Sequence, residues 1–276
     1  MYLLRLVIKG KGRIKVMVDI KKLKCFLLDM DGTIYLGNRL IPGAKEFIEF
    51  LETSGRKFLF FTNNPTKDAE QYQDKLNRLG IHVSIEHILT SGMATVEFLK
   101  RNTSYKNLLT VAPPSFENQL VRAGFNLVQD NPDTVLISFD ISLTYEKLRR
   151  ATYWLLKGMP YVATNPDLVC PTENGPIPDC GSIARLLHAA TNREPRYIGK
   201  PNPEMIEMAL KILNMQPQNT AMVGDRLYTD MEMAYRAGVT SILVLSGETT
   251  LEQLNNSEKK PDFVFPSVKD LHTALL

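Results

Sequence analysis

Short apolar runs alternate along the chain with segments whose apolar residues recur at helical spacing. Residues 25–29 and 57–62 are almost continuously apolar, as the strands of a buried parallel sheet are. Between them, residues 44–51 place alanine, phenylalanine, isoleucine and leucine on one helical face, and a Ser-Gly pair at 54–55 ends the pattern. The alternation predicts a parallel β-sheet with helices on both faces.

A second series of strand and helix patterns occupies the middle of the chain. Residues 108–112 and 134–139 are predicted strands, and residues 144–157 form a helical pattern that Gly158 ends. Residues 170–181 are dense in proline and glycine, which is typical of a connecting loop. Alternating helices and strands then continue to the end of the chain.

The simplest architecture for these patterns is an α/β domain interrupted by a smaller α/β domain. We place the inserted domain at residues 90–182, and the interrupted domain at residues 21–89 and 183–276. A length of 276 residues suits two domains of ordinary size. The expected fold class is therefore α/β, with a Rossmann-like parallel sheet in the larger domain.

The positive charge of the chain is concentrated at its start. The formal net charge is +3, but residues 1–24 carry eight basic residues and one acidic residue, so the rest of the chain is net negative. We interpret residues 1–20 as a basic leader that is disordered or a non-native start. The alternative is an arm that binds nucleic acid or an anionic membrane.

Hydropathy and cysteine content indicate a protein of a reducing aqueous compartment. No apolar run reaches the roughly 18 residues that a membrane helix needs. Three cysteines are sparse and odd in number, which argues against a disulfide framework. We therefore expect a cytoplasmic protein that binds neither a membrane nor nucleic acid.

The strongest chemical signal is the sequence Asp29-Met-Asp31-Gly-Thr, directly after the first predicted strand. Ligands bind beyond the carboxyl ends of strands in open parallel sheets, and two acids two residues apart can surround one ion or one phosphoryl group. A calcium-binding EF-hand is excluded, because it needs glycine and glutamate where Ile34 and Leu40 stand. The alternative is an ordinary acidic turn that contains a glycine.

Three further strand ends carry polar residues. Thr62 and Asn63 follow the second predicted strand, Lys200 precedes a predicted helix, and Asp225 and Asp230 follow a late strand. Hydroxyl and N–H groups suit phosphate oxygens, a lysine is a point charge for a phosphoryl group, and carboxylates suit Mg²⁺. Each motif also has a structural explanation: a turn that caps the next helix, a solvated lysine, and acids attracted to a helix N-terminus. Four such motifs at four strand ends favour one common site.

In this order, the motifs DMDGT, FFTNN, GKPNP and GDRLYTD resemble the four signatures of the haloacid dehalogenase (HAD) superfamily of aspartate-nucleophile phosphatases. The segments FTNNPTK, VATNPD and SILVLSGETT are similar to its NagD-type (class IIA) subfamily, which contains nucleotide, sugar-phosphate and 4-nitrophenyl phosphatases. The resemblance covers residues 22–276. It implies that residues 90–182 form an α/β cap domain inserted into a HAD core.

The resemblance implies a Mg²⁺-dependent reaction through an aspartyl-phosphate. Asp29 is then the nucleophile, while Asp31 protonates the leaving oxygen and later takes a proton from water. Mg²⁺ is expected to bind the carboxylates of Asp29 and Asp225 and the backbone carbonyl of Asp31. Asp230 is expected just outside these ligands, where it orders metal-bound water or Lys200.

The same resemblance assigns phosphate binding to Thr62, to the backbone N–H of Asn63 and to Lys200. Asn165 and Asp167 lie in a loop at which a cap would face the crevice, so we expect them in a substrate loop. Substrate choice is expected to depend on such loops, because the four motifs act on any phosphoryl group.

The predicted function is the hydrolysis of small phosphate monoesters, and a phosphotransferase or phosphomutase on the same scaffold is the alternative. A phospho-accepting signalling module also uses clustered aspartates, a threonine and a lysine. It is shorter, however, has no cap and lacks the Gly-Asp-x4-Asp pattern found here. The expected partner is a small phosphate ester, and the resemblance also implies a homodimer.

Overall fold

The computed structural model describes residues 18–170 and 175–276. The predicted leader at residues 1–20 lies outside the described residues, apart from its last three positions. Within the described ranges, no helix combines the length and the apolar character that crossing a membrane requires. The chain divides into two compact units. Unit 1 holds the described residues up to Phe61 with Lys75–Ile88 and Ile206–Leu276, and unit 2 holds Thr62–Asp74 and Leu89–Met205.

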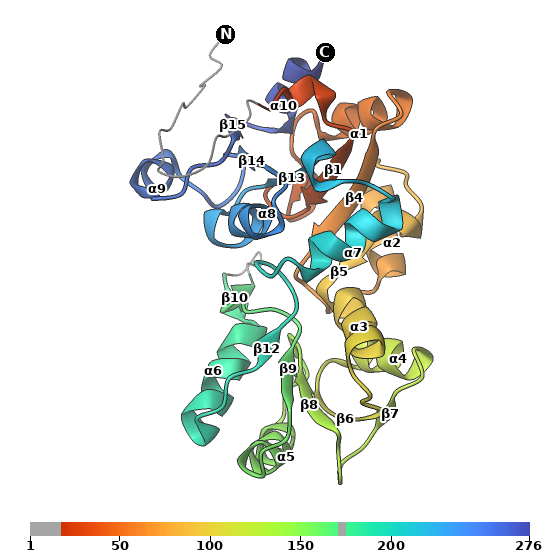
Figure 1. Ribbon diagram of the computed structural model, residues 1–276, viewed down its shortest axis with the longest axis vertical. Helices are drawn as coiled ribbons and strands as arrows, with labels where there is room; N and C mark the ends of the chain where they lie inside the picture. Colours follow the sequence, from red (N-terminus) through yellow and green to blue (C-terminus); the bar gives the residue numbers. More distant parts are fainter. Residues whose placement is uncertain (1–17, 171–174) are drawn as a thin grey trace. The chain divides into compact units, whose positions relative to one another are not determined.

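A six-stranded sheet places β1 between β13 and β4, in the order β15-β14-β13-β1-β4-β5 (Figure 1). β1 pairs in parallel with both neighbours, so that Leu28 lies opposite Val223 and Asp29 lies opposite Phe61. All five β1 residues are buried, and β1 and β4 have the predicted bounds. The strands are β1 (Cys25–Asp29), β4 (Lys57–Thr62), β5 (Ile88–Thr90), β13 (Thr220–Gly224), β14 (Thr240–Val244) and β15 (Phe263–Phe265).

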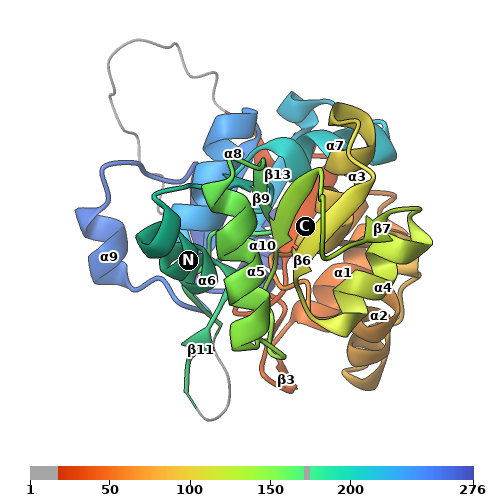
Figure 2. The same cartoon turned by 90° about the horizontal axis from the view of Figure 1, so that it is seen from below.

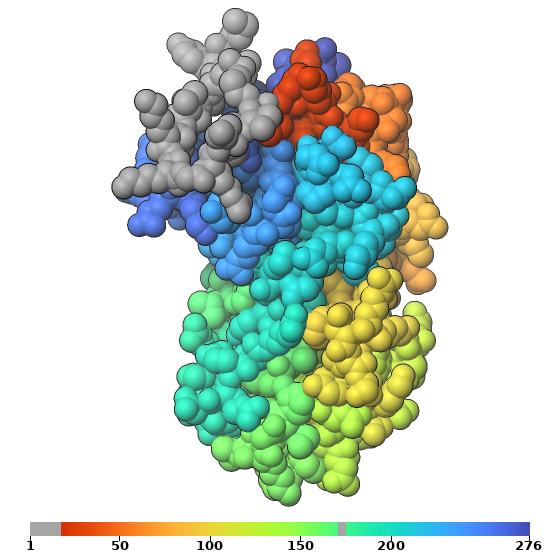
Figure 3. Space-filling model, in the orientation of Figure 1, coloured from red at the N-terminus to blue at the C-terminus, as the bar shows by residue number. Residues whose placement is uncertain are grey.

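Helix α1 (Ala44–Thr53) attaches to β1 by its apolar face. Phe47 meets Phe26 of β1 edge to face, with ring centroids 6.0 Å apart. Helix α10 (Val268–Leu275) packs beside α1, and Figure 3 shows the red N-terminal part of the described chain next to the dark blue C-terminus. Other elements are β2 (Tyr35–Leu36), β3 (Arg39–Leu40), α2 (Ala69–Arg78), α7 (Glu204–Leu213), α8 (Glu232–Ala237), α9 (Leu251–Asn256) and the short turns η1 (Ile20–Lys22), η2 (Ile85–His87) and η3 (Pro217–Asn219).

Unit 2 contains a parallel five-stranded sheet in the order β12-β9-β8-β6-β7. Helices α5 and α6 lie on one side of its strands, and α3 and α4 lie on the other (Figures 1 and 2). Two parallel sheets with intervening helices confirm the predicted α/β fold class. The elements are β6 (Asn107–Val111), β7 (Asn126–Leu127), β8 (Thr134–Ile137), β9 (Tyr161–Ala163), β12 (Arg196–Tyr197), the hairpin β10 (Val169–Cys170) and β11 (Ile177–Pro178), α3 (Ser91–Asn102), α4 (Pro114–Arg122), α5 (Tyr145–Leu156) and α6 (Cys180–Thr191).

The sheet of unit 2 includes elements beyond residue 182, where we placed the end of the insertion. Helix α6 packs here because Ile183, Ala184 and Leu187 are buried in the apolar cluster that β8, β9 and α5 share. Strand β12 then pairs in parallel with β9. The division into core and cap domains at the boundaries given above remains a prediction.

A buried carboxylate anchors the start of α5. Lys147 Nζ lies 2.6 Å from Asp140 Oδ2 and donates to the Ala112 carbonyl at 2.7 Å. Ser142 donates to Asp140 Oδ1 through both its N–H and its hydroxyl. The Asp140 side chain has no solvent exposure, so these donors replace the water that it loses on folding.

We expect Lys147→Met to lower the free energy of unfolding of unit 2 by about 2 kcal/mol, because a buried carboxylate loses its counter-charge. The Lys147 side chain is 25% exposed, which keeps the loss below that of a fully buried pair. Urea denaturation followed by the fluorescence of Trp154, the single tryptophan, measures this loss in unit 2. Arg101→Met, which removes a surface pair between the exposed Arg101 and the partly exposed Glu97, is the control and should cost less than about 0.5 kcal/mol. Equal losses in the two variants would contradict the anchoring role.

Candidate active site

Three aspartates of unit 1 form a buried acidic cluster. Asp29 is the last residue of β1, Asp225 directly follows β13, and Asp230 lies in the π-helical turn η4 (Leu227–Met231). One carboxylate oxygen of each lies within 4.8 Å of the others. The parallel pairing of β1 with β13 brings the first two to the same edge of the sheet, which is the convergence expected at strand ends.

Backbone N–H groups hold Asp225 in place, and two glycines leave room for its carboxylate. The Glu248 N–H donates to Asp225 Oδ2 at 2.6 Å, and the Thr249 N–H donates to the Asp225 carbonyl at 3.2 Å. A Cβ atom at Gly32 or at Gly247 would overlap the Asp225 carboxylate, so only glycine leaves room there. Gly32 also has a φ of 83°, in the left-handed region that favours glycine.

Arg226 lies against the cluster, and sequence reasoning missed it. Its guanidinium pairs with Glu248 at 2.8 Å, and its backbone N–H donates to Asp230 Oδ2 at 3.2 Å. Burial alone would lower the pKa of Arg226, but nearby negative charges, with that of Asp29 first, raise this pKa above its usual value. The guanidinium therefore stays protonated and offsets part of the charge of the cluster.

Asp31 lies in the turn after β1 and is not one of the three converging carboxylates. The Gly32 N–H donates to the Tyr35 carbonyl at 2.8 Å, and the Ser246 hydroxyl donates to the Gly32 carbonyl at 2.7 Å. These bonds fix the turn, and the Asp31 residue is partly exposed. The structure thus brings together Asp29 and Asp225 of the predicted metal ligands and adds the Asp230 carboxylate to them.

The cluster has the donor chemistry of a divalent-metal site. Carboxylate oxygens are hard ligands of the kind that Mg²⁺ and Ca²⁺ bind. Three buried carboxylates so close together repel one another, and a divalent cation lowers that repulsion more than one guanidinium does. The residues present therefore fit the metal that the sequence motifs imply.

Thr62, the last residue of β4, takes part in a local turn. Its Oγ1 accepts a hydrogen bond from the Asn64 N–H at 3.1 Å, which is the structural explanation given above for this motif. A hydroxyl that accepts one bond still has its own hydrogen to donate. The turn is therefore compatible with the predicted contact to a phosphate oxygen.

Lys200 is buried, which contradicts the alternative of a solvated lysine. The residue is only 3% exposed. Its backbone pairs with the side chain of Asn63, whose Oδ1 accepts from the Lys200 N–H at 2.8 Å and whose Nδ2 donates to the Lys200 carbonyl at 3.0 Å. Unit 2 thus brings together two of the predicted phosphate-binding residues, and an ammonium group removed from water requires anionic partners.

Asn165 and Asp167 belong to the same network of unit 2. Asn165 is fully buried, and its Nδ2 donates to Asp179 Oδ1 at 3.0 Å and to Asp167 Oδ2 at 3.3 Å. Its Oδ1 accepts from the Thr164 hydroxyl at 2.8 Å. These contacts favour a role for Asn165 in holding the loop, and the substrate contact expected for both residues remains a prediction.

Sequence reasoning also missed the loop that follows β14. Ser246, Gly247 and Glu248 contact the turn at Gly32 and the carboxylate of Asp225. The sequence did contain a signal for this loop, because the apolar run of the segment SILVLSGETT ends in Ser-Gly, as at the end of a further strand. Strand patterns do not fix the conformation of a loop, however, so the donors that its backbone supplies could not be inferred.

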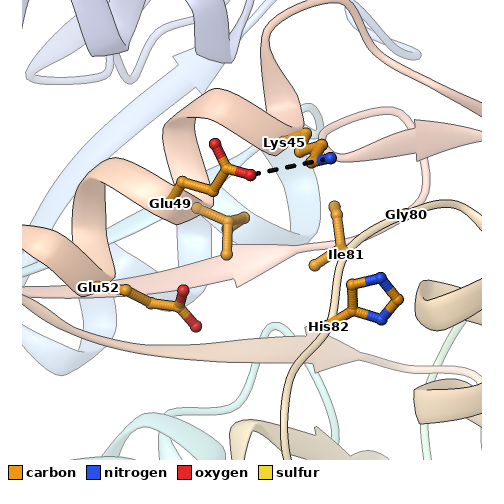
Figure 4. Close-up of a pocket in the computed structure, with 7 residues that line it drawn as sticks. Lys45, Glu49, Glu52, Gly80, Ile81 and His82 are labelled. Atoms are coloured by element: carbon orange, nitrogen blue, oxygen red, sulfur yellow. Dashed lines mark ion pairs between the residues drawn. The ribbon is translucent and has the colours of Figure 1, made fainter.

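A small pocket of about 150 Å³ lies in unit 1, between α1 and the segment that follows α2 (Figure 4). Its lining includes Lys45, Glu52 and His82, and Lys45 pairs with Glu49 at 3.8 Å. None of the predicted site residues lines this pocket. We therefore place the chemistry at the acidic cluster.

Two family models match the chain. A model described as haloacid dehalogenase-like hydrolase matches residues 26–126, and one described as HAD-hydrolase-like matches residues 197–271. The first range contains the motifs at Asp29 and Thr62, and the second contains those at Lys200 and Asp225.

Relatives cover nearly the whole chain. The acid sugar phosphatase of Staphylococcus haemolyticus is 36% identical over 256 residues, which are 92% of this chain and 96% of that protein. The crystal structure of 4-nitrophenylphosphatase from Thermotoga maritima is 42% identical, with a TM-score of 0.89 over 93% of this chain and 99% of that one. NagD from E. coli K-12 is 31% identical, with a TM-score of 0.85 over 90% of this chain and 98% of that one. The chain therefore belongs to the haloacid dehalogenase-like hydrolases, and among them to the NagD-type phosphatases.

Proposed function

We propose that this protein hydrolyses small phosphate monoesters with Mg²⁺, through an aspartyl-phosphate on Asp29. The observation that carries the proposal is the convergence of the Asp225 and Asp230 carboxylates on Asp29, at the strand end that bears the DMDGT motif. The relatives support the substrate class, because they include an acid sugar phosphatase and a 4-nitrophenylphosphatase.

In this proposal, the carboxylates of Asp29 and Asp225 and the carbonyl of Asp31 hold Mg²⁺, with Asp230 just outside them. When bound, the metal ion would lower the repulsion between a carboxylate nucleophile and a phosphate dianion. The Glu248 N–H contributes to the site by keeping the Asp225 carboxylate in a fixed orientation.

Asp29 attacks phosphorus in line, so an Asp29 O–P bond forms as the P–O bond to the leaving group breaks. Asp31 gives a proton to the leaving oxygen. It then takes a proton from the water that attacks the aspartyl-phosphate, and inorganic phosphate is released. The different surroundings of the two aspartates support this division of roles, because Asp29 is buried among carboxylates and Asp31 is partly exposed.

Thr62, the Asn63 N–H and Lys200 bind phosphoryl oxygens in this proposal, and their roles rest on the sequence motifs. The buried position of Lys200 and the donor capacity of the Thr62 hydroxyl support them. The core and cap boundaries, the substrate loop of Asn165 and Asp167, a cytoplasmic location and a homodimer belong to the same proposal and rest on the family resemblance.

We expect release of phosphate from sugar phosphates, glycerol phosphate, nucleotides or 4-nitrophenyl phosphate with Mg²⁺ and none with EDTA. Asp29→Asn should lower kcat/KM at least about 10³-fold, because it removes the nucleophile and keeps the size of the side chain. Circular dichroism checks the fold, and the exposed Asp130→Asn is a control that should keep full activity. Metal-dependent turnover by Asp29→Asn close to that of the parent would exclude Asp29 as nucleophile. Transfer of phosphate to an added alcohol without hydrolysis would identify the phosphotransferase alternative.

Asp31→Asn should slow both steps by about 10²- to 10⁴-fold, since the amide can neither give nor take the proton. The loss should be larger for alkyl phosphates than for 4-nitrophenyl phosphate, because nitrophenolate leaves with little need for a proton. Rapid-quench measurements of phosphoenzyme formation and decay separate the two steps. A pH–rate profile that matches the parent's would show that Asp31 transfers no proton.

Gly247→Ala should weaken Mg²⁺ binding at least about tenfold, because the added Cβ would displace the Asp225 carboxylate. The dependence of the melting temperature on Mg²⁺ concentration measures this affinity without any turnover. Gly55→Ala is the matched control, since its Cβ meets no atom within 4 Å and its φ of 69° costs only stability. Unchanged Mg²⁺ affinity in Gly247→Ala would remove Asp225 from the metal site.

A further inference from the structure

The side chain of Asn63 pairs with both backbone groups of Lys200. Oδ1 accepts from the Lys200 N–H at 2.8 Å, and Nδ2 donates to the Lys200 carbonyl at 3.0 Å. Asn63 is 8% exposed and Lys200 is 3% exposed, so water does not compete for these bonds. An amide that bonds the N–H and the C=O of one residue fixes both the position and the orientation of that residue.

Asp167 determines which way the Asn63 amide faces. The second Nδ2 hydrogen of Asn63 is donated to Asp167 Oδ2 at 2.9 Å. A carboxylate accepts hydrogen bonds and donates none, so a flipped amide would set its oxygen against both this carboxylate and the Lys200 carbonyl. All three hydrogen bonds are possible in only one orientation of the Asn63 amide. In that orientation, Oδ1 accepts one bond and both Nδ2 hydrogens are donated.

The backbone on either side of the contact is also fixed. The Asn63 carbonyl accepts from the Ser91 hydroxyl at 2.7 Å, and the Gly199 N–H donates to the Thr164 carbonyl at 2.7 Å. A Cβ at Gly199 would lie 2.6 Å from Asn63 Oδ1 and from the Thr164 oxygen. The segment before Lys200 is thus held between Asn63 and Thr164, and only glycine fits at this position.

We propose that the Asn63 side chain is a positioning residue, which holds the Lys200 backbone so that the lysine presents its ammonium group to the phosphoryl group. The inference rests on the proposed role of Lys200 in binding that group. It gives the amide of Asn63 a task separate from the phosphate contact proposed for its backbone N–H. A lysine side chain is long and flexible, so a fixed backbone limits where its charge can lie.

A double-mutant cycle with Lys200 tests the proposal. Asn63→Ala should lower kcat/KM for 4-nitrophenyl phosphate about tenfold to a hundredfold in the parent, and less than about threefold in a Lys200→Met background. Asn63→Ala should likewise raise the inhibition constant of inorganic phosphate in the parent and much less in the Lys200→Met background. This constant is a second readout that reports phosphate binding instead of turnover. Asn63→Asp is nearly isosteric but faces Asp167 and the Lys200 carbonyl with oxygen, so it should lose as much as Asn63→Ala. If Asn63→Ala does not fold, Asn63→Asp takes its place in the double-mutant cycle with Lys200→Met.

Asn64→Ala is the matched control, because the Asn64 amide bonds Thr66 and Cys170 instead of Lys200. Any cost of this variant should be equal in the two backgrounds, as for a purely structural residue. Equal costs of Asn63→Ala in the two backgrounds would overturn the positioning role and leave the role of Lys200 intact. If Lys200→Met itself keeps the kcat/KM and the phosphate inhibition of the parent, the proposed role of Lys200 fails, and the inference about Asn63 fails with it.

Discussion

Mutual repulsion among three buried carboxylates is the constraint on which the rest of unit 1 depends. Oxygens of Asp29, Asp225 and Asp230 lie within 4.8 Å of one another, a spacing at which charges removed from water interact strongly. The chain offsets this repulsion with the guanidinium of Arg226 and with backbone N–H groups directed at Asp225 and Asp230. These donors restrain the carboxylates, and the three acidic oxygens have the donor chemistry that a divalent cation prefers.

Three glycines determine where the carboxylates of Asp225 and Asp230 can lie. Gly32, Gly224 and Gly247 each stand where a Cβ atom would overlap an aspartate side chain. The main chain can therefore approach the acids closely enough to donate hydrogen bonds to them. The glycine of the DMDGT motif is thus necessary to the geometry of the cluster, because it leaves room for the Asp225 carboxylate.

The sheet and the acidic cluster could be predicted because they depend on local patterns that a parallel sheet aligns. β1 and β4 are apolar runs with the expected bounds, and Asp29 and Asp225 stand at the ends of paired strands. The contacts of Arg226 and of the loop at Gly247 depend on loop conformation, which neither periodicity nor spacing determines. The burial of Lys200 was equally hidden, because the amide that holds its backbone lies 137 residues earlier in the chain.

The contact between Asn63 and Lys200 also sets a limit on what a positioning residue can do. A backbone clamp fixes where the lysine side chain begins, but four rotatable bonds separate that point from the ammonium group. Burial of the whole residue, at 3% exposure, supplies the remaining restraint. Loss of the Asn63 amide should therefore spread the position of the charge without removing it. If Lys200 binds phosphate as proposed, its side chain should therefore contribute more to that binding than the Asn63 amide does.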